Sequence, residues 1–203
     1  MILAALVLLV CFVCFASVNL HNILVTHKRE DRGKSIAEVE HPAGFVVSVA
    51  ALGTGVYFVE VFLFQLLVFS GYGFVLWSFP LQLPSSVYVQ FIGVVLTVTG
   101  YFVFIWSVGA RGRYSVSWAM PEDQKLVTWG PYRYVRNPSY LGYFLMFFGL
   151  FLVWSNVFTV FPFLAIPGYY RVAVEEEGLL EKRFGEAYVE YRKKTGRFIP
   201  KIR

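Results

Sequence analysis

The sequence predicts an all-α integral membrane protein with about five transmembrane helices. Its 203 residues are 57% hydrophobic and only 15% charged, a composition too apolar for an ordinary soluble domain of this size. Four stretches contain no Asp, Glu, Lys or Arg: 1–26, 43–59, 61–110 and 137–170. Each stretch is close to or longer than the roughly 20 residues that an α-helix needs to cross a hydrocarbon core. The chain therefore divides into membrane-spanning segments and polar connections.

Apolar runs and helix breakers place the expected helices in order along the chain. We expect three long helices and then a short hairpin of two more, at about 1–21, 43–69, 87–109, 140–154 and 157–174. The first is expected to be a retained helix, since no basic residue precedes its apolar run as in a secretory signal. Gly and Pro residues break the pattern between the second and third helices. We expect one membrane domain over residues 1–203, with the first three helices in 1–110.

The 18 Lys and Arg residues predict the orientation of the chain. Four lie in 22–42, five in 110–139 and nine from Arg171 onward, so the remaining connections have none. Because Lys and Arg concentrate in cytoplasmic loops, we expect the N-terminus outside and the C-terminus in the cytoplasm. The net charge of +5 then lies on a face that attracts the anionic headgroups of membrane lipids. It gives no case for binding nucleic acid.

A first polar motif, GPYRYVRNPSYLG, occupies residues 130–142 where the hairpin begins. Pro138 suits the first turn of a helix, and Asn137 suits the cap before it. A helix N-terminus carries partial positive charge, and with Arg133 and Arg136 beside it this end suits a carboxylate or a phosphate. The alternative is that both arginines only anchor the chain at the cytoplasmic face.

A second polar motif begins with Glu175, Glu176 and Glu177, directly after the hairpin. Consecutive residues on a helix point about 100° apart, so we expect one or two of these carboxylates to face a pocket shared with the first motif. The alternative is a solvated charged turn. The segment that follows, residues 179–191, has apolar residues near helical spacing. We expect it to be amphipathic, and either to lie on the headgroups or to fold back over the bundle.

The two motifs resemble those of the isoprenylcysteine carboxyl methyltransferase family and, more distantly, of the phospholipid N-methyltransferases. The resemblance covers residues 126–200 and rests on LVTWGPYRYVRNPSYLGYFLMFFG followed by EEEGLLEKRFGEAYVEYRKK. It implies an integral membrane enzyme that binds S-adenosylmethionine between the motifs at the cytoplasmic side. The cofactor-binding residues that it implies are Tyr132, Arg136, Asn137, Pro138, Tyr140, Leu141, Glu176 and Glu177. The family often has His where this chain has Asn137, and this departure leaves the acceptor open.

The expected reaction is methyl transfer from S-adenosylmethionine to the carboxylate of a prenylcysteine-like lipid that enters from the bilayer. Such a transfer is an in-line displacement, so the enzyme mainly holds the reacting groups in line. A carboxylate acceptor needs no general base, and no metal is expected. Arg136 and Glu176 are the candidate catalytic residues, and Arg136 would orient the carboxylate of either cofactor or acceptor. Three alternatives stay open: an aminophospholipid N-methyltransferase, whose acceptor must lose a proton, a non-catalytic scaffold of the same fold, and a related reductase.

Some residues inside the predicted helices have two interpretations. Gly93, Gly100 and Gly109 in the third helix suit close packing of helices, and alternatively the close approach of a ligand. Glu60 is the only charged residue deep inside a predicted helix, so it is a candidate for function or for a structural hydrogen bond. Trp106 is among the aromatic residues suited to face the cofactor.

Overall fold

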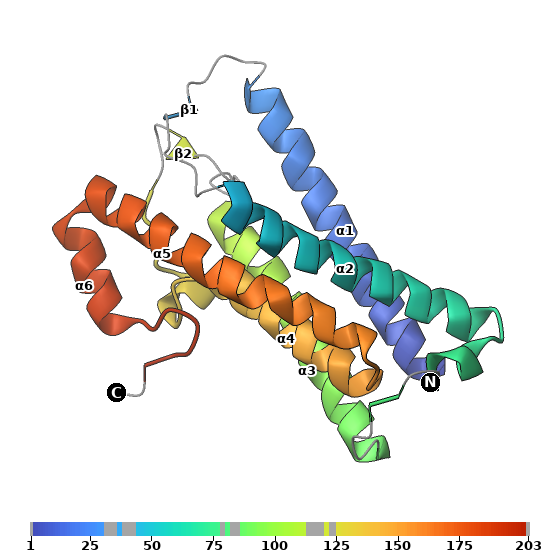
Figure 1. The fold of residues 1–203 in the computed structure, drawn as a ribbon. Helices are drawn as coiled ribbons and strands as arrows, with labels where there is room; N and C mark the ends of the chain where they lie inside the picture. Colours follow the sequence, from blue (N-terminus) through green and yellow to red (C-terminus); the bar gives the residue numbers. More distant parts are fainter. Residues whose placement is uncertain are drawn as a thin grey trace.

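The computed structural model of the chain describes residues 2–30, 36–37, 44–77, 80–81, 86–112, 120–121 and 125–201. The α-helices are α1 (Ile2–Glu30), α2 (Gly44–Phe69), α3 (Val87–Arg111), α4 (Pro138–Val153), α5 (Ala165–Phe184) and α6 (Glu186–Lys194) (Figure 1). The shorter elements are the 3-10 helices η1 (Gly73–Trp77), η3 (Gly130–Arg133) and η4 (Phe158–Leu164) and the strands β1 (Ile36–Ala37) and β2 (Met120–Pro121). The two strands pair antiparallel over two residues each. The predicted all-α fold is therefore confirmed.

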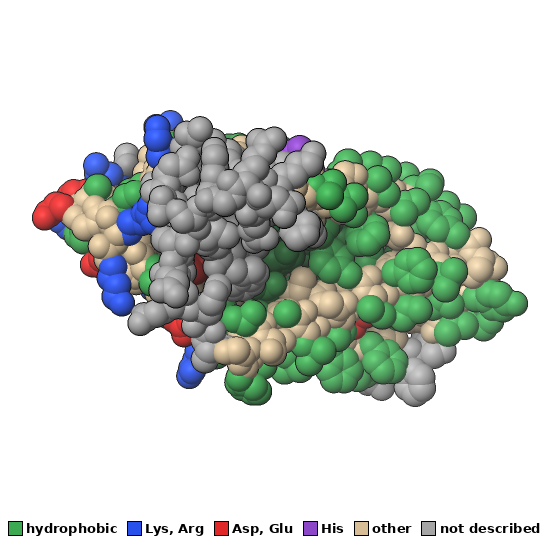
Figure 2. All heavy atoms as spheres, turned by 90° about the horizontal axis from the view of Figure 1, so that it is seen from above, with side chains coloured by type: hydrophobic (Ala, Val, Ile, Leu, Met, Phe, Trp, Pro, Cys, Tyr) green, Lys and Arg blue, Asp and Glu red, His purple; other side chains and the backbone are tan. Residues whose placement is uncertain are grey.

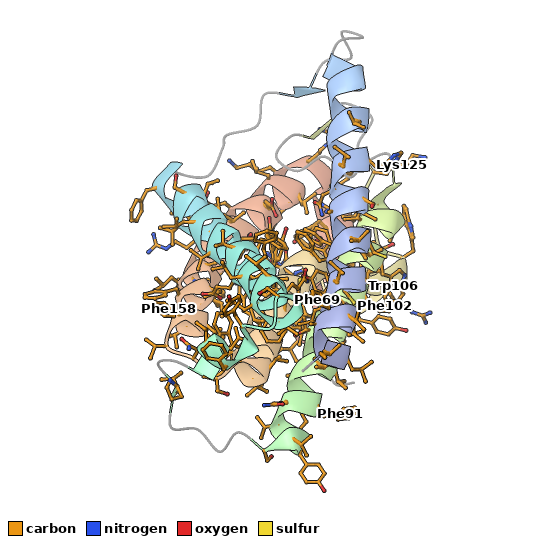
Figure 3. The ribbon with its side chains drawn as sticks, turned by 90° about the vertical axis from the view of Figure 1, so that its right-hand side faces the viewer. Phe69, Phe91, Phe102, Trp106, Lys125 and Phe158 are labelled. Carbon is orange, nitrogen blue, oxygen red and sulfur yellow. The ribbon has the colours of Figure 1, made fainter. Side chains whose placement is uncertain are left out.

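Three of these helices are long and apolar enough to cross a membrane: residues Ile2–His21 of α1, and the whole of α2 and α3. A fourth, α4, is a shorter apolar helix of 16 residues. Large hydrophobic side chains project outward from the helices, among them Phe91, Phe102 and Trp106 on α3 and Phe69 at the end of α2 (Figure 3). A surface this apolar suits lipid and not water. The chain is a membrane protein.

Glycines allow α3 and α4 to pack with their backbones in close contact. A Cβ atom added to Gly93 would lie 2.7 Å from the carbonyl oxygen of Gly149, and one added to Gly100 would lie 2.6 Å from that of Gly142. Small residues permit this approach in membrane helices. The packing interpretation is confirmed for Gly93 and Gly100. It is wrong for Gly109, because no described atom beyond its chain neighbours and the nearby backbone of α3 lies within 4 Å of a Cβ atom placed there.

Aromatic side chains from five helices meet in the core: Phe15 of α1, Tyr57 of α2, Tyr101 of α3, Phe147 of α4 and Tyr169 of α5. The hydroxyl of Tyr57 donates a hydrogen bond to that of Tyr101 over 3.2 Å, so two buried polar groups satisfy each other. Tilted and edge-on contacts join the rings, with centroids 5.7 Å apart for Phe15 and Tyr101 and 5.3 Å for Tyr57 and Phe147. The helices thus share one core.

The second arm of the hairpin begins and ends later than predicted. Residues 158–164 form η4, and α5 then continues to Phe184, well past the expected end at residue 174. Pro162 explains the late start, since it has no N–H to extend an α-helical ladder. The Glu triplet therefore lies within α5 and is not a turn. The first arm, α4, agrees with the prediction, whereas α1 extends beyond its apolar part to Glu30.

The chain reverses direction between α5 and α6. Gly185 adopts a φ of 52°, which favours glycine, and it ends α5. Helix α6 then turns back beside the bundle and buries Tyr188 and Tyr191. Of the two positions expected for the amphipathic segment, the structure shows the folded-back one.

The helix ends that flank the basic connections lie at one end of the molecule. In Figure 1 the last residues of α1, α3 and α5 lie at the same end as the first residues of α2 and α4. The last residues of α2 and the first residues of α3, which flank a connection without Lys or Arg, lie at the other end, together with residues 154–157. In the space-filling view, charged side chains cluster at the left end, where α6 lies, while hydrophobic side chains predominate at the right end (Figure 2). This arrangement gives the bundle one polar end.

Candidate active site

The first motif begins at this polar end with a 3-10 turn followed by a short extended segment. Gly130 opens the turn with a φ of 60°, and Pro131 follows it within η3. Extended residues then pair with the C-terminal segment. The Arg136 N–H donates to the carbonyl of Gly196 over 2.9 Å, and the Asn137 N–H donates to that of Arg197 over 3.1 Å. The chain after α6 is thereby fixed against the start of α4.

Glu177 lies at the centre of a buried ion-pair cluster that joins the two motifs. Its carboxylate accepts from Arg136 Nη2 over 3.2 Å, from Arg197 Nε over 3.0 Å and from Asn137 Nδ2 over 2.8 Å. The side chains of Arg136 and Glu177 are only 8% and 6% exposed. Burial alone would raise the pKa of the Glu177 carboxyl. The hydrogen bonds from Arg197 and Arg136 outweigh it and hold this pKa below its usual value.

The cap predicted for Asn137 is wrong, although Pro138 does occupy the first turn of α4 as expected. The Asn137 side chain makes no capping hydrogen bond to the helix. Its Nδ2 donates instead to Glu177 over 2.8 Å, and this charge-assisted hydrogen bond fixes the orientation of the side chain. Pro138 is buried, and the N–H of Leu141 donates to the Asn137 carbonyl over 3.1 Å.

Arg136 is held by protein groups on two sides of its guanidinium. Nη1 donates to the carbonyls of Thr195 and Arg192, and Nη2 reaches Glu177. Only Nε is buried without a hydrogen-bond partner. The residue therefore fastens the end of α6 to the start of α4.

Glu176, the neighbour of Glu177, lies in a different environment. The Tyr140 hydroxyl donates to both of its oxygens, over 2.9 and 3.0 Å, and no ion pair to Glu176 is present among the described residues. Burial raises the pKa of its carboxyl to about 7, although the Tyr140 hydrogen bond and the charge of Arg111 oppose the rise and the charge of Glu177 adds to it. Glu175 is exposed. The side chains of the three glutamates thus lie in three different environments, as expected for consecutive residues on a helix.

A stack of tyrosine rings lies beside Glu176. The Tyr140 ring stacks on Tyr169 with centroids 4.8 Å apart, and Tyr143 stacks on Tyr169 at 5.2 Å with an interplanar angle of 15°. The Tyr169 hydroxyl also lies 2.6 Å from the Thr54 hydroxyl, which ties α5 to α2. The ring that carries the hydroxyl bound to Glu176 is therefore held in place by packing on its face.

Arg111, the last residue of α3, reaches the same region. Its Nη2 donates to the hydroxyl of Ser139 over 3.3 Å, and Ser139 shares a second hydrogen bond with Ser107 over 2.7 Å. Burial raises the pKa of Tyr132, and the Arg111 charge together with hydrogen bonds to both serines limits the rise. Sequence reasoning counted Arg111 only among the basic residues. Its position at the end of an apolar helix was the feature of the sequence that could have marked it as a candidate site residue.

Two other candidates lie elsewhere. Trp106 is 41% exposed on the outer face of α3, beside Phe102 with ring centroids 5.8 Å apart (Figure 3). Glu60 is buried in α2, and neither of its oxygens has a hydrogen-bond partner within the described ranges. The structural hydrogen bond expected for Glu60 is therefore not present there. The cluster that the structure assembles contains Arg136, Asn137, Tyr140, Glu176 and Glu177.

Comparison with known proteins finds the same region. Residues 88–187 match the family model described as phospholipid methyltransferase. The chain is 37% identical over 83 residues to a protein-S-isoprenylcysteine O-methyltransferase of Schizosaccharomyces pombe, covering 40% of this chain and 35% of that protein. For the enzymes of that name in Saccharomyces cerevisiae and Homo sapiens, the identities are 31% over 117 residues and 28% over 127 residues. Those alignments cover 55% and 60% of this chain, and 48% and 45% of the relatives. The chain thus spans between about a third and a half of their length.

Proposed function

We propose that the chain is a membrane methyltransferase of the isoprenylcysteine carboxyl methyltransferase family and that it uses S-adenosylmethionine. The proposed acceptor is the carboxylate of a prenylcysteine-like lipid. One observation carries the proposal: residues about forty positions apart meet at the start of α4, through the bonds of Tyr140 to Glu176 and of Asn137 to Glu177. Both bonds lie inside the stretch that matches the family.

The residues at this site fit the chemical groups of the donor. S-adenosylmethionine presents an ammonium, ribose hydroxyls and a sulfonium, all of which a carboxylate attracts or accepts hydrogen bonds from. Glu176 has no cation of its own within hydrogen-bond distance among the described residues, so its oxygens suit such a donor. We propose that the donor pocket comprises Tyr132, Arg136, Asn137, Pro138, Tyr140, Leu141, Glu176 and Glu177.

Within this pocket the residues have different tasks. Glu176 and Tyr140 would contact the donor, whereas Arg136, Asn137 and Glu177 hold α4, α5 and the C-terminal segment together around it. Arg136 acts as a positioning residue, since its guanidinium is engaged by the protein. S-adenosylmethionine supplies an activated methyl group when bound. The chain then aligns the acceptor carboxylate with that group and excludes water, and no general base is needed for a carboxylate.

We further propose five spans, with the N-terminus outside and the C-terminus in the cytoplasm. The helix ends that flank the basic connections lie at one end of the bundle, and this supports the orientation. Helix α4 spans about 24 Å at 1.5 Å per residue, a little less than a ~30 Å hydrocarbon core. The start of α4 therefore lies close to the cytoplasmic interface. There a donor from the cytoplasm meets an acceptor whose tail stays in the bilayer.

Transfer of a labelled methyl group tests the proposal. Purified chain in lipid nanodiscs would receive labelled S-adenosylmethionine and, separately, a prenylcysteine, the same compound with its carboxyl group amidated, and phosphatidylethanolamine. We expect labelled ester on the free carboxylate alone. Absence of label on every acceptor, together with no thermal stabilisation by the donor, would favour a non-catalytic scaffold.

N-methylation of an aminophospholipid is a second candidate function. An amine acceptor must lose a proton, and the pKa of about 7 for Glu176 suits a base at neutral pH. The match to a phospholipid methyltransferase model points the same way. Labelled phosphatidylethanolamine with unlabelled prenylcysteine would establish this candidate and overturn the first.

A further inference from the structure

Arg111 and Arg136, both at the polar end, differ in how many of their N–H groups are used. Arg136 places Nη1 on two backbone carbonyls and Nη2 on Glu177. Arg111 has one hydrogen bond among the described residues, the 3.3 Å contact of Nη2 with Ser139, and its Nε is buried without a partner. A guanidinium offers five donors in a fixed plane. Most N–H donors of Arg111 therefore have no acceptor among the described residues.

A buried guanidinium N–H without an acceptor costs folding free energy unless a ligand supplies that acceptor, and Nε of Arg111 is such a group. Side chains on the protein do not supply a counter-charge here, because no carboxylate of the described residues pairs with Arg111. Glu176 is near enough for the Arg111 charge to affect its carboxyl. Arg111 on α3 contacts Ser139, and Glu176 on α5 contacts Tyr140, the next residue along α4. The arginine thus approaches from α3 the same end of α4 that Glu176 approaches from α5.

We propose that Arg111, held in place by Ser139, forms a carboxylate-binding subsite of this pocket, which a substrate completes. The inference rests on the proposed function. A planar guanidinium binds a carboxylate through two parallel hydrogen bonds. The Ser139 hydroxyl accepts a hydrogen bond from Nη2 of Arg111 and so orients the guanidinium. Its own proton goes to Ser107, because the Ser107 hydroxyl donates to the carbonyl of Phe104. Ser107 holds that hydroxyl in position. Opposite charges on Arg111 and Glu176 also give the pocket two poles, which suits a ligand that carries both charges.

Two substrates of the proposed reaction carry a carboxylate: the amino-acid end of the donor and the acceptor. Binding measurements with purified Arg111→Gln protein separate them. The first probe is S-adenosylhomocysteine, titrated by calorimetry, and the second is its decarboxylated analogue. If the subsite binds the donor, the dissociation constant for S-adenosylhomocysteine rises roughly tenfold or more in the variant. The decarboxylated analogue then binds wild type and variant equally.

If the subsite takes the acceptor, the dissociation constant of S-adenosylhomocysteine stays as in wild type. The KM for a prenylcysteine then rises roughly tenfold or more in the Arg111→Gln variant. Arg111→Lys should recover part of either loss, since a lysine keeps the charge without the paired N–H groups. The matched control is Arg133→Gln, which removes an exposed arginine from the same end of the bundle.

The outcomes separate this inference from the function on which it rests. Wild-type protein that binds S-adenosylhomocysteine and methylates its acceptor, with both constants unchanged in Arg111→Gln, overturns the Arg111 subsite alone. Wild-type protein that binds neither ligand overturns the proposed function, and the subsite with it. An equal loss in Arg111→Gln and Arg133→Gln would show a general effect of charge and would also overturn the subsite.

Discussion

Glu176 and Glu177 are adjacent on α5, yet their carboxylates lie in different surroundings. Glu177 accepts hydrogen bonds from Arg136, Arg197 and Asn137, and its pKa is held low. Glu176 accepts from Tyr140, and burial raises its pKa to about 7. A carboxylate surrounded by protein donors fastens the fold, whereas one with spare acceptor capacity suits a ligand. The comparison divides the polar end into a clamp around Glu177 and a binding side around Glu176.

Removing the clamp should have the largest effect. Glu177→Ala leaves buried arginine charge without its partner, and we expect it to lower the free energy of unfolding by about 3–5 kcal/mol. Unfolding of the purified protein in detergent measures the change. The control is Glu175→Ala at the exposed neighbour, which should stay within about 0.5 kcal/mol of wild type. Equal stability of the two variants would show that the clamp does not hold α5 to α4.

Glu176→Gln should separate binding from stability. The amide has nearly the same shape and still accepts from Tyr140, so we expect the melting temperature to stay the same or rise. The charge that we assign to donor binding is lost, and the KM for S-adenosylmethionine should increase about tenfold. Steady-state methyl transfer and thermal unfolding measure the two quantities. A drop in melting temperature as large as that of Glu177→Ala would place Glu176 in the clamp as well.

The raised pKa of Glu176 predicts a pH dependence near neutrality. At a pKa of about 7 the ionised fraction rises from roughly a tenth at pH 6 to roughly nine tenths at pH 8. Donor affinity should therefore rise several-fold across this window in wild type and stay flat in Glu176→Gln. The groups that face this carboxyl are Tyr140, Arg111 and Glu177. A flat wild-type profile would argue against Glu176 as the titrating contact.

The raised pKa of Glu176 also determines whether the stability of the folded protein rises or falls with pH. The unfolded chain ionises Glu176 near its ordinary value of 4.5, while the folded chain keeps the proton up to about 7. Between these values the folded state binds more protons, so the Glu176 contribution to stability falls as pH rises. A ligand cation that binds the carboxylate should offset that loss.

Tyr140→Phe should give the smallest effect. It keeps the ring that stacks on Tyr169 and removes only the hydroxyl bound to Glu176. Because that hydrogen bond lowers the pKa of Glu176, the midpoint of the affinity profile should move to higher pH. Titration of donor binding from pH 6 to pH 9 measures the midpoint. A shift to lower pH would contradict the assigned direction.

The sequence predicted the apolar helices well because long charge-free segments have few structures open to them in a bilayer. It also predicted that the two motifs would meet, since a two-helix hairpin returns the chain to its starting side. The extended pairing of Arg136 and Asn137 with Gly196 and Arg197 was not predicted. Such contacts join residues about sixty positions apart and depend on the reversal at Gly185.

The role of single polar residues was harder to predict. Asn137 had the spacing of a helix cap, and only the position of Glu177 shows why its amide turns away. Arg111 had no motif around it and stood among other basic residues of the polar end. Hydrophobic periodicity gave no help, because lipid and protein core are both apolar and a membrane helix is hydrophobic on every side.

Calorimetric titration of S-adenosylhomocysteine at pH 8 tests the central division between Glu176 and Glu177 most directly. The comparison uses wild type, Glu176→Gln and the exposed control Glu175→Gln, each in detergent and with its melting temperature measured beforehand. We predict that Glu176→Gln alone weakens binding, by about tenfold, with no loss of thermal stability. Equal dissociation constants for Glu176→Gln and wild type would contradict a donor site on the Glu176 side of α5.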